Sequence, residues 1–159
     1  IIDSAQVYFA APDEPSSTWT DIGSGGGLPG VVVATLAQED GQQTNVTMVE
    51  SDKRKSVFLR TAIRELSLSN AKVVNERIES AQIPISDFVS ARALAPLTDL
   101  FKLSQGFSDQ NTTFLFQKGK NWVSEVEIAQ NHWSFDYDAI KSETDSNAVI
   151  LKIRGLSRV

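Results

Sequence analysis

Apolar positions in this chain follow helical spacing in some segments and form short β-rich runs in others. Residues 1–11 carry apolar side chains at helical spacing and predict a helix, which the segment 12–17, rich in proline and serine, brings to an end. Runs rich in β-branched and aromatic residues predict strands, at 18–22, 46–49, 71–75, 85–90, 113–116, 133–137 and 148–153. Helical patterns predict further helices, at 31–36, 51–66, 93–103 and 121–130.

Strands and helices alternate in this pattern until the last two predicted strands, which have no helix between them. The missing helix predicts an antiparallel hairpin at the end of the chain. We therefore expect an α/β fold with a mostly parallel seven-stranded sheet and one antiparallel strand from the C-terminal hairpin. In the helix over 51–66 we expect Ser51 to act as the cap and the apolar side chains to face inward, namely Val57, Phe58, Ile63 and Leu66.

The length of 159 residues is that of one domain. The only methionine is Met48, so we expect residues 1–17 to be the end of an N-terminal helical segment and loop whose earlier part is absent. Residues 18–159 would then form the domain itself.

A glycine-rich segment, residues 21–30, joins the first predicted strand to the next helix and reads Asp-Ile-Gly-Ser-Gly-Gly-Gly-Leu-Pro-Gly. Pro29 favours the first turn of a helix, because the fixed φ of proline suits that position. The glycines leave no side chain between the backbone and a ligand, which predicts a nucleotide-like ligand at the carboxyl edge of the sheet. Gly25, Gly27 and Gly30 match G-x-G-x-x-G, a pattern that alone would also fit a dinucleotide.

Two carboxylates flank this turn in the predicted sheet. Glu50 directly follows the second strand, where it can accept hydrogen bonds from both ribose hydroxyls of a bound nucleotide, although a helix-capping role is the alternative. Asp21 precedes the turn. A second negative charge disfavours the pyrophosphate of NAD and favours the sulfonium and ammonium groups of S-adenosylmethionine.

Composition narrows the function further. The chain has no cysteine, which excludes disulfides, thiolate catalysis and Cys-ligated zinc and suits a reducing cytoplasm. No apolar run approaches the length of a membrane span, and we expect no metal site. The net charge of −5 argues against a chain that binds polyanions over its whole surface, but it leaves room for a local basic face.

The motifs together resemble those of one family. The glycine segment 21–30 is followed by Glu-Ser-Asp-Lys-Arg-Lys-Ser-Val-Phe-Leu-Arg at 50–60, Arg-Ile-Glu at 77–79, Ser-Ala-Arg-Ala-Leu-Ala-Pro-Leu at 90–97 and Gln-Lys-Gly-Lys-Asn at 117–121. In this order they resemble the bacterial small-subunit rRNA guanine-N7 methyltransferase family (RsmG, also called GidB). The resemblance implies a class I S-adenosylmethionine-dependent methyltransferase fold (Rossmann-like), acting on guanine 527 in the 530 loop of 16S rRNA. It also implies the small ribosomal subunit as partner, and we expect a cytoplasmic monomer.

The resemblance implies a set of site residues as well. Those expected to bind the cofactor are Gly23, Gly25, Leu28, Glu50, Ile78, Glu79 and Arg92. Within this set, Gly23 and Leu28 would line the cofactor from the glycine turn, and Ile78 and Glu79 would hold the adenine. Arg92, which follows the fourth strand, is the residue expected to serve catalysis, where methyl donor and acceptor meet.

Methylation of guanine N7 is compatible with a set of site residues in which no residue is assigned as a general base. N7 has a lone pair and no proton to lose, so its methylation needs alignment more than a general base. The guanidinium of Arg92 can donate to guanine O6 or to a phosphate, and a structural ion pair with Asp21 or Glu50 is the alternative for this side chain. The segment around Arg92 also lacks the Asn/Asp-Pro-Pro-aromatic motif of enzymes that methylate exocyclic amines.

Cations for RNA backbone contacts are predicted on one helix and after the fifth strand, namely Lys53, Arg54, Lys55, Arg60, Arg64, Lys118 and Lys120. His132 and the three tryptophans are interpreted as structural. Two other functions stay open: an NAD-dependent oxidoreductase that uses the same glycines and Glu50, and a non-catalytic rRNA-binding module with a methyltransferase fold.

Overall fold

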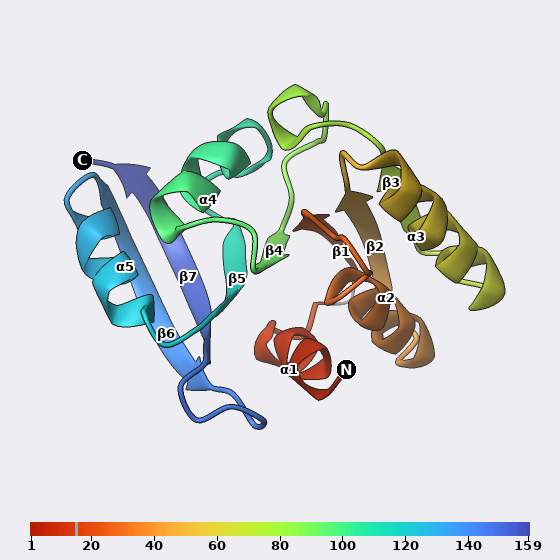
Figure 1. Cartoon of the computed structure of the whole chain (residues 1–159), viewed down its shortest axis with the longest axis horizontal. Coiled ribbons are helices and arrows are strands. Elements are labelled where there is room, and N and C mark those ends of the chain that lie inside the picture. The colour runs from red at the N-terminus through yellow and green to blue at the C-terminus, as the bar shows by residue number, and fades with distance from the viewer. Residues whose placement is uncertain (15) are drawn as a thin grey trace.

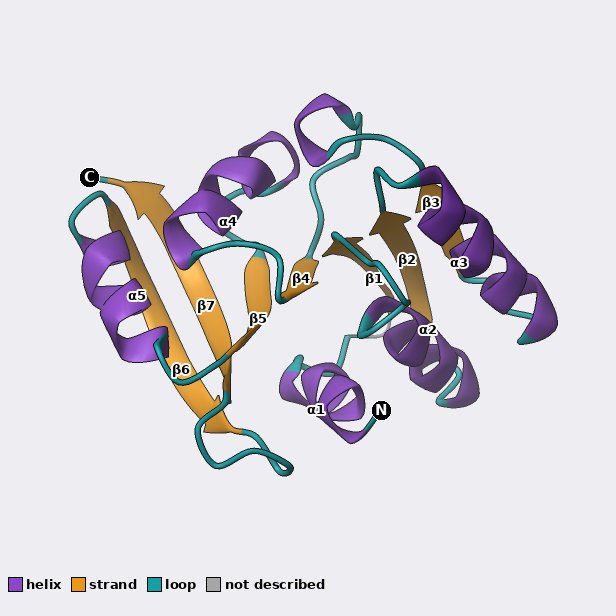
Figure 2. Ribbon diagram, viewed as in Figure 1, coloured by secondary structure: helices purple, strands orange, loops and turns teal. Residues whose placement is uncertain are grey.

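The computed structural model describes residues 1–14 and 16–159, and within them seven strands form one sheet with the order β3-β2-β1-β4-β5-β7-β6 (Figures 1 and 2). The strands are β1 (Ser16–Ile22), β2 (Gln43–Val49), β3 (Ala71–Val74), β4 (Phe88–Arg92), β5 (Thr113–Lys118), β6 (Trp133–Lys141) and β7 (Val149–Arg158). All neighbours from β3 to β5 are parallel, whereas β7 is antiparallel to both β5 and β6. The expected sheet, with one antiparallel strand from a C-terminal hairpin, is confirmed.

Helices cover both faces of this sheet. They are α1 (Ile2–Ala10), α2 (Gly30–Glu39), α3 (Lys53–Glu65), α4 (Leu97–Ser104) and α5 (Trp122–Gln130), with short 3-10 turns η1 (Ile78–Ser80) and η2 (Gln105–Phe107). One apolar cluster includes residues of α4 and α5, and the other includes residues of α1, α2 and α3. Figure 1 shows α4 and α5 beside the strands from β5 to β6, with α2 and α3 beside β1 to β3.

Alternation along the central strands explains why both faces are buried. In β5, Phe114 and Phe116 belong to the cluster under α4 and α5, whereas Leu115 between them belongs to the cluster under α1 to α3. A strand buried on both faces has a continuous apolar run, as the sequence of this segment does. The arrangement leaves the carboxyl ends of β1, β2 and β4 at one edge of the sheet.

Several predicted boundaries differ from the structure. Strands β1 and β2 begin earlier than expected, since residues 16, 17 and 43–45 are already paired in the sheet, and β4 is shifted toward Arg92. The helix expected over 93–103 begins only at Leu97. Ala93 has a φ of 48°, outside the helical range, and the helix starts directly after Pro96. Residue 15, part of the predicted loop 12–17, lies outside the described residues.

The inward face predicted for α3 is wrong in three of its four positions. Val57 and Phe58 are each 54% exposed and Leu66 is 50% exposed, whereas Ser56 and Leu59 are fully buried and Ile63 is partly buried. Because small residues can occupy the contact face of a helix, the stripe that faces the sheet runs through 56, 59 and 63. The helix cap also differs, since Asp52 and not Ser51 accepts a hydrogen bond, from the backbone N–H of Lys55 at 3.0 Å.

In the described part of the chain, no helix is long and apolar enough to cross a membrane.

Candidate functional site

The glycine turn and the two carboxylates meet at the carboxyl edge of β1 and β2. These strands are parallel and in register, with Ile22 opposite Val49, so Asp21 and Glu50 approach the same edge. The backbone N–H groups of Gly23 and Ser24 donate to the carbonyl oxygen of Val49 and join the turn to β2. This placement agrees with the expectation from the sequence.

Asp21 is buried beneath the turn, where it is in contact with hydroxyl groups of the chain. Its side chain is 1% exposed and accepts hydrogen bonds from the hydroxyls of Ser24 and Ser90, each at 2.7 Å. Burial raises the pKa of Asp21 to about 6, and the hydrogen bonds from Ser90, Ser24 and the Gly30 backbone partly oppose this shift. We expected the charge of Asp21 to face the ligand. In the structure the carboxylate instead accepts hydrogen bonds from hydroxyls of the chain itself.

Gly30 permits this close packing of helix α2 on Asp21. A Cβ atom placed on Gly30 would lie 2.7 Å from Oδ2 of Asp21 and 2.8 Å from Cγ of Met48. Real side chains do not come so close, so the first residue of α2 has to be a glycine. The last glycine of the motif thus serves packing of the helix against the sheet.

Glu50 links the glycine turn to the start of α3. Its Oε1 atom accepts from the backbone N–H of Gly25 at 2.8 Å, and its Oε2 atom accepts from the backbone N–H of Asp52 at 2.8 Å. The side chain is 7% exposed. The carboxylate is therefore held in one position at the wall of the cavity described next.

A cavity of about 360 Å³ lies at this edge and gathers most of the predicted site. The predicted residues that line it are Gly23, Gly25, Glu50, Ile78, Glu79 and Arg92. Leu28 lies on the same turn but is not among the lining residues in the described part of the chain, so its role stays a prediction. The side chain of Leu94 covers Gly23, whereas a Cβ built on Gly26 would meet no atom within 4 Å. The space over the middle of the turn is open.

Arg92 lies at the end of β4, at the boundary between this cavity and a second one. Its side chain is exposed. Within residues 1–14 and 16–159 it forms no ion pair, so the structural pairing with Asp21 or Glu50 considered above is not observed. The guanidinium is available to a ligand.

Other lining residues were not predicted as site residues, among them Lys55, Glu76 and Leu94. Glu76 lies two positions after the end of β3, much as Glu50 lies one position after the end of β2. The argument that identified Glu50, an acidic residue just after a parallel strand, would therefore have identified Glu76 as well. Lys55 was expected to contact an RNA backbone, but it lines the cavity from the first turn of α3. Leu94 belongs to the motif 90–97, but its place over the glycine turn could not be predicted, because it depends on the non-helical backbone at Ala93.

The predicted cations differ in their surroundings. Lys118 is 8% exposed and pairs with Glu125 at 2.7 Å, and its ammonium also donates to the carbonyl oxygen of Ala95. The ammonium is therefore bound within the protein and does not face RNA as predicted. Arg64 pairs with the adjacent Glu65. Lys53, Arg54, Lys55 and Arg60 are exposed on α3 and form no ion pair in the described part of the molecule.

The three tryptophans pack in or against the core, as expected, whereas the structural role of His132 stays a prediction. Trp19 is 1% exposed and donates its indole N–H to Ser90, and Trp133 is 4% exposed. Trp122 packs against the cluster under α4 and α5, and His132 lies in the corner between α5 and β6.

The sequence matches one family model and proteins from several bacteria. The model of the family GidB, rRNA small subunit methyltransferase G, matches residues 1–150. The chain is 49% identical over 159 residues to ribosomal RNA small subunit methyltransferase G of Ruegeria sp. (strain TM1040), and covers 100% of itself and 76% of that protein. It is 45% identical over 156 residues to the protein of the same name from Paracoccus denitrificans (strain Pd 1222), with 98% and 78% covered.

Solved structures share the fold at low sequence identity. A SAM-dependent methyltransferase from Aquifex aeolicus superposes with a TM-score of 0.74 at 12% identity, over 96% of this chain and 89% of that one. A ribosomal protein L11 methylase from Lactobacillus delbrueckii subsp. bulgaricus gives a TM-score of 0.73 at 17% identity, over 98% and 76%. The sheet order and helix placement are therefore those of a class I methyltransferase.

Proposed function

Because the chain belongs to the rRNA small subunit methyltransferase G (GidB) family, we propose that it transfers a methyl group from S-adenosylmethionine to N7 of guanine 527, in the 530 loop of 16S rRNA. The observation that carries the proposal is the cavity at the carboxyl edge of the sheet, where the glycine turn, Glu50 and Arg92 come together. Open α/β sheets bind nucleotide-like ligands at this edge.

The residues around this cavity fit S-adenosylmethionine. Gly25 lines the cavity, and a Cβ atom built on it would meet, among the described residues, only the carbonyl oxygen of Gly23 at 3.7 Å, so the glycine turn offers bare backbone to a ligand. Each oxygen of Glu50 accepts one backbone hydrogen bond, and a carboxylate has about four lone-pair sites, so Glu50 can also accept from ribose hydroxyls. Ile78 and Glu79 line the cavity from η1, in the position proposed for adenine. When bound, the cofactor supplies a methyl group on a positively charged sulfur.

Arg92 is the residue proposed to hold the acceptor. Guanine N7 carries a lone pair and no proton, so the chain has to align the base and does not have to remove a proton. A guanidinium donates strong, directional hydrogen bonds, and guanine presents O6 next to N7. Arg92 lines both cavities, so its hydrogen bond to O6 would fix the base with N7 facing the cofactor cavity.

Methyl transfer to small ribosomal subunits tests the proposal directly. The protein is incubated with labelled S-adenosylmethionine and subunits from a strain that lacks the modification, and the labelled base is then mapped. We expect one labelled guanine, in the 530 loop, with the methyl group on N7. A label on adenine or cytosine, or binding of the subunit without transfer, would overturn the assignment. Binding of a nicotinamide dinucleotide instead of S-adenosylmethionine would support the oxidoreductase alternative.

Glu50→Ala is expected to weaken the binding of S-adenosylmethionine by about 1.5–3 kcal/mol, the range of hydrogen bonds to charged groups. Isothermal titration calorimetry measures this change. Glu127→Ala is the matched control, because Glu127 is an exposed carboxylate on α5 and is not among the described residues that line the cofactor cavity. The loss of the Gly25 and Asp52 contacts lowers stability too, so the titration is run below the unfolding transition of the variant. Unchanged affinity would mean that Glu50 does not contact the ribose.

Helix α3 supplies a surface that fits the rRNA partner. Its exposed side chains include Lys53, Arg54 and Arg60, in a chain whose net charge is −5. Phe58 and Val57 lie exposed between these cations, and an exposed aromatic ring offers a stacking surface for an unpaired base. The first turn of the helix adjoins the cofactor cavity through Lys55.

The double variant Lys53→Ala/Arg60→Ala is expected to weaken subunit binding and to make it less dependent on salt. Each cation that neutralises a phosphate contributes about one unit to the slope of log affinity against log salt concentration, so the slope should fall by about two. Filter binding across a salt series measures it. Lys102→Ala on α4 is the control, since this lysine pairs with Asp99 and should leave the slope unchanged. An unchanged slope in the double variant would place the RNA elsewhere.

A further inference from the structure

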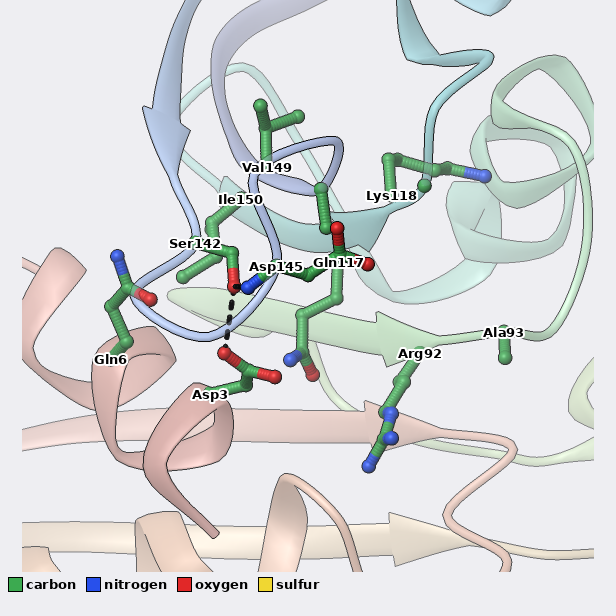
Figure 3. A pocket seen from close by; sticks show the side chains of 12 residues that line it. Asp3, Gln6, Arg92, Ala93, Gln117, Lys118, Ser142, Asp145, Val149 and Ile150 are labelled. Atoms are coloured by element: carbon green, nitrogen blue, oxygen red, sulfur yellow. Dashed lines mark hydrogen bonds between the residues drawn. The ribbon is translucent and has the colours of Figure 1, made fainter.

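A second cavity, of about 230 Å³, lies on the other side of Arg92 from the cofactor cavity. It lies between the first turns of α1, the carboxyl ends of β4 and β5, and the loop that connects β6 to β7 (Figure 3). Arg92 and Ala93 line both cavities, so a molecule in the second one adjoins the proposed cofactor. The first part of the sequence, treated above only as a helix, therefore contributes directly to this space.

Asp3 places a fixed carboxylate in this cavity. Its oxygens accept hydrogen bonds from the hydroxyl of Ser142 at 2.8 Å and from that of Thr144 at 2.7 Å. These hydrogen bonds, that from Thr144 first, hold the pKa of Asp3 below its ordinary value, so the side chain is charged at neutral pH. Two hydroxyl donors leave part of the carboxylate's acceptor capacity for a ligand.

Gln117 adds an acceptor without a partner. Its side-chain Oε1 atom is buried, and no donor among the described residues forms a hydrogen bond with it. Buried polar atoms of folded proteins nearly always have a partner, so an unpaired one on a residue that lines the cavity points to a ligand with a donor, toward which the amide has to turn because its oxygen has almost no accessible surface here. Figure 3 shows the side chains of Asp3, Gln117 and Arg92 directed into the same space.

We propose that this cavity receives the acceptor base, with Asp3 and Gln117 accepting hydrogen bonds from N1–H and the N2 amino group of guanine and Arg92 donating to O6. The proposal rests on the methyl transfer to guanine argued above. The donors N1–H and N2 lie on the Watson–Crick edge of guanine and N7 lies on its Hoogsteen edge, with O6 at the corner between them, so Arg92 would hold O6 while N7 faces the cofactor cavity. A base that is methylated inside a pocket is commonly recognised by that edge after it leaves the stack.

The same groups discriminate against adenine. Adenine carries an amino donor in place of O6 and an unprotonated N1, so it would place a donor against Arg92 and an acceptor against Asp3. Leaving buried polar groups unpaired penalises the wrong base far more than a poor fit of shape does. The acceptor specificity would therefore come from α1 and β5 together with Arg92.

Inosine, which lacks the N2 amino group, tests the assignment. Small subunits are reconstituted from 16S rRNA with either guanine or inosine at the target, and kcat/KM is measured with both. We expect the wild-type protein to prefer guanine about tenfold, the value of one lost hydrogen bond to a buried acceptor. The double variant Asp3→Ala/Gln117→Leu should lose activity on guanine and show no preference between the two bases.

The ratio of the two rates does not depend on how much of the variant is folded, so a merely structural role would leave it unchanged. Ser142→Ala is the control, because it removes a hydroxyl partner of Asp3 but keeps the carboxylate, and it should retain the preference for guanine. A double variant that keeps the preference overturns the subsite and leaves the proposed function standing. A wild-type protein that methylates no guanine at all overturns both.

Discussion

Replacing Arg92 with alanine is expected to lower kcat for methyl transfer on the order of 100-fold, the cost of removing one well-placed charged donor from a reaction site. Arg92 lines both cavities, is exposed and forms no ion pair in the described part of the chain. Its removal therefore leaves no buried charge behind, and the fold should keep its stability. The loss arises because N7 is no longer held toward the methyl group, so kcat should fall more than KM rises.

Single-turnover rates on unmethylated small subunits measure this loss separately from product release. Arg92→Lys keeps the charge without the planar fork of donors and should recover only part of the rate. Arg154→Ala is the matched control, since Arg154 is also an exposed arginine but pairs with Asp138 on the neighbouring strand β6. If Arg92→Ala turns over as fast as Arg154→Ala, the acceptor is held by other residues.

The part of the site that is local in sequence could be predicted from the sequence. Residues 21–30 contain the end of a strand, the turn and the start of a helix. The groups that form this part of the site are therefore consecutive in the sequence and can be recognised together. Glu50 follows from the same logic, because parallel neighbours end at one edge of a sheet. The mostly parallel sheet and the C-terminal hairpin were also predictable, since alternation of strands and helices leaves few topologies.

The directions of individual side chains could not be predicted, because they depend on tertiary packing. Asp21 turns inward to the hydroxyls of Ser24 and Ser90, and Ser90 stands 69 residues away in sequence. Periodicity counted Phe58 as a core residue, whereas Ser56 occupies the buried stripe of α3. Lys118 was interpreted as a free cation because its partner Glu125 lies in the next helix. Asp3 was not predicted as a site residue, because its partners Ser142 and Thr144 lie near the other end of the chain.

Asp21 is expected to make the protein less stable as the pH rises through the range between its unfolded and folded pKa values. Burial raises the pKa of Asp21 from 3.8 to about 6, so the folded protein binds this proton more tightly than the unfolded chain does. Its contribution to stability is fully present below the lower value and is lost as the pH rises through the upper one. One pKa unit corresponds to about 1.36 kcal/mol, so the free energy of unfolding should lose about 3 kcal/mol over this range.

Asp21→Asn isolates this contribution, because asparagine has the same shape, cannot ionise and can still bond to the hydroxyls of Ser24 and Ser90. Urea unfolding of both proteins from about pH 4 to about pH 7 gives the difference in stability, in which the titration of every other carboxylate cancels. The wild-type protein should lose stability relative to Asp21→Asn across this range. Glu127→Gln, an exposed change on α5, should follow the wild-type curve. Parallel curves for Asp21→Asn and wild type would mean that the Asp21 carboxylate is in contact with water, and the glycine turn would then have to be supported by another group.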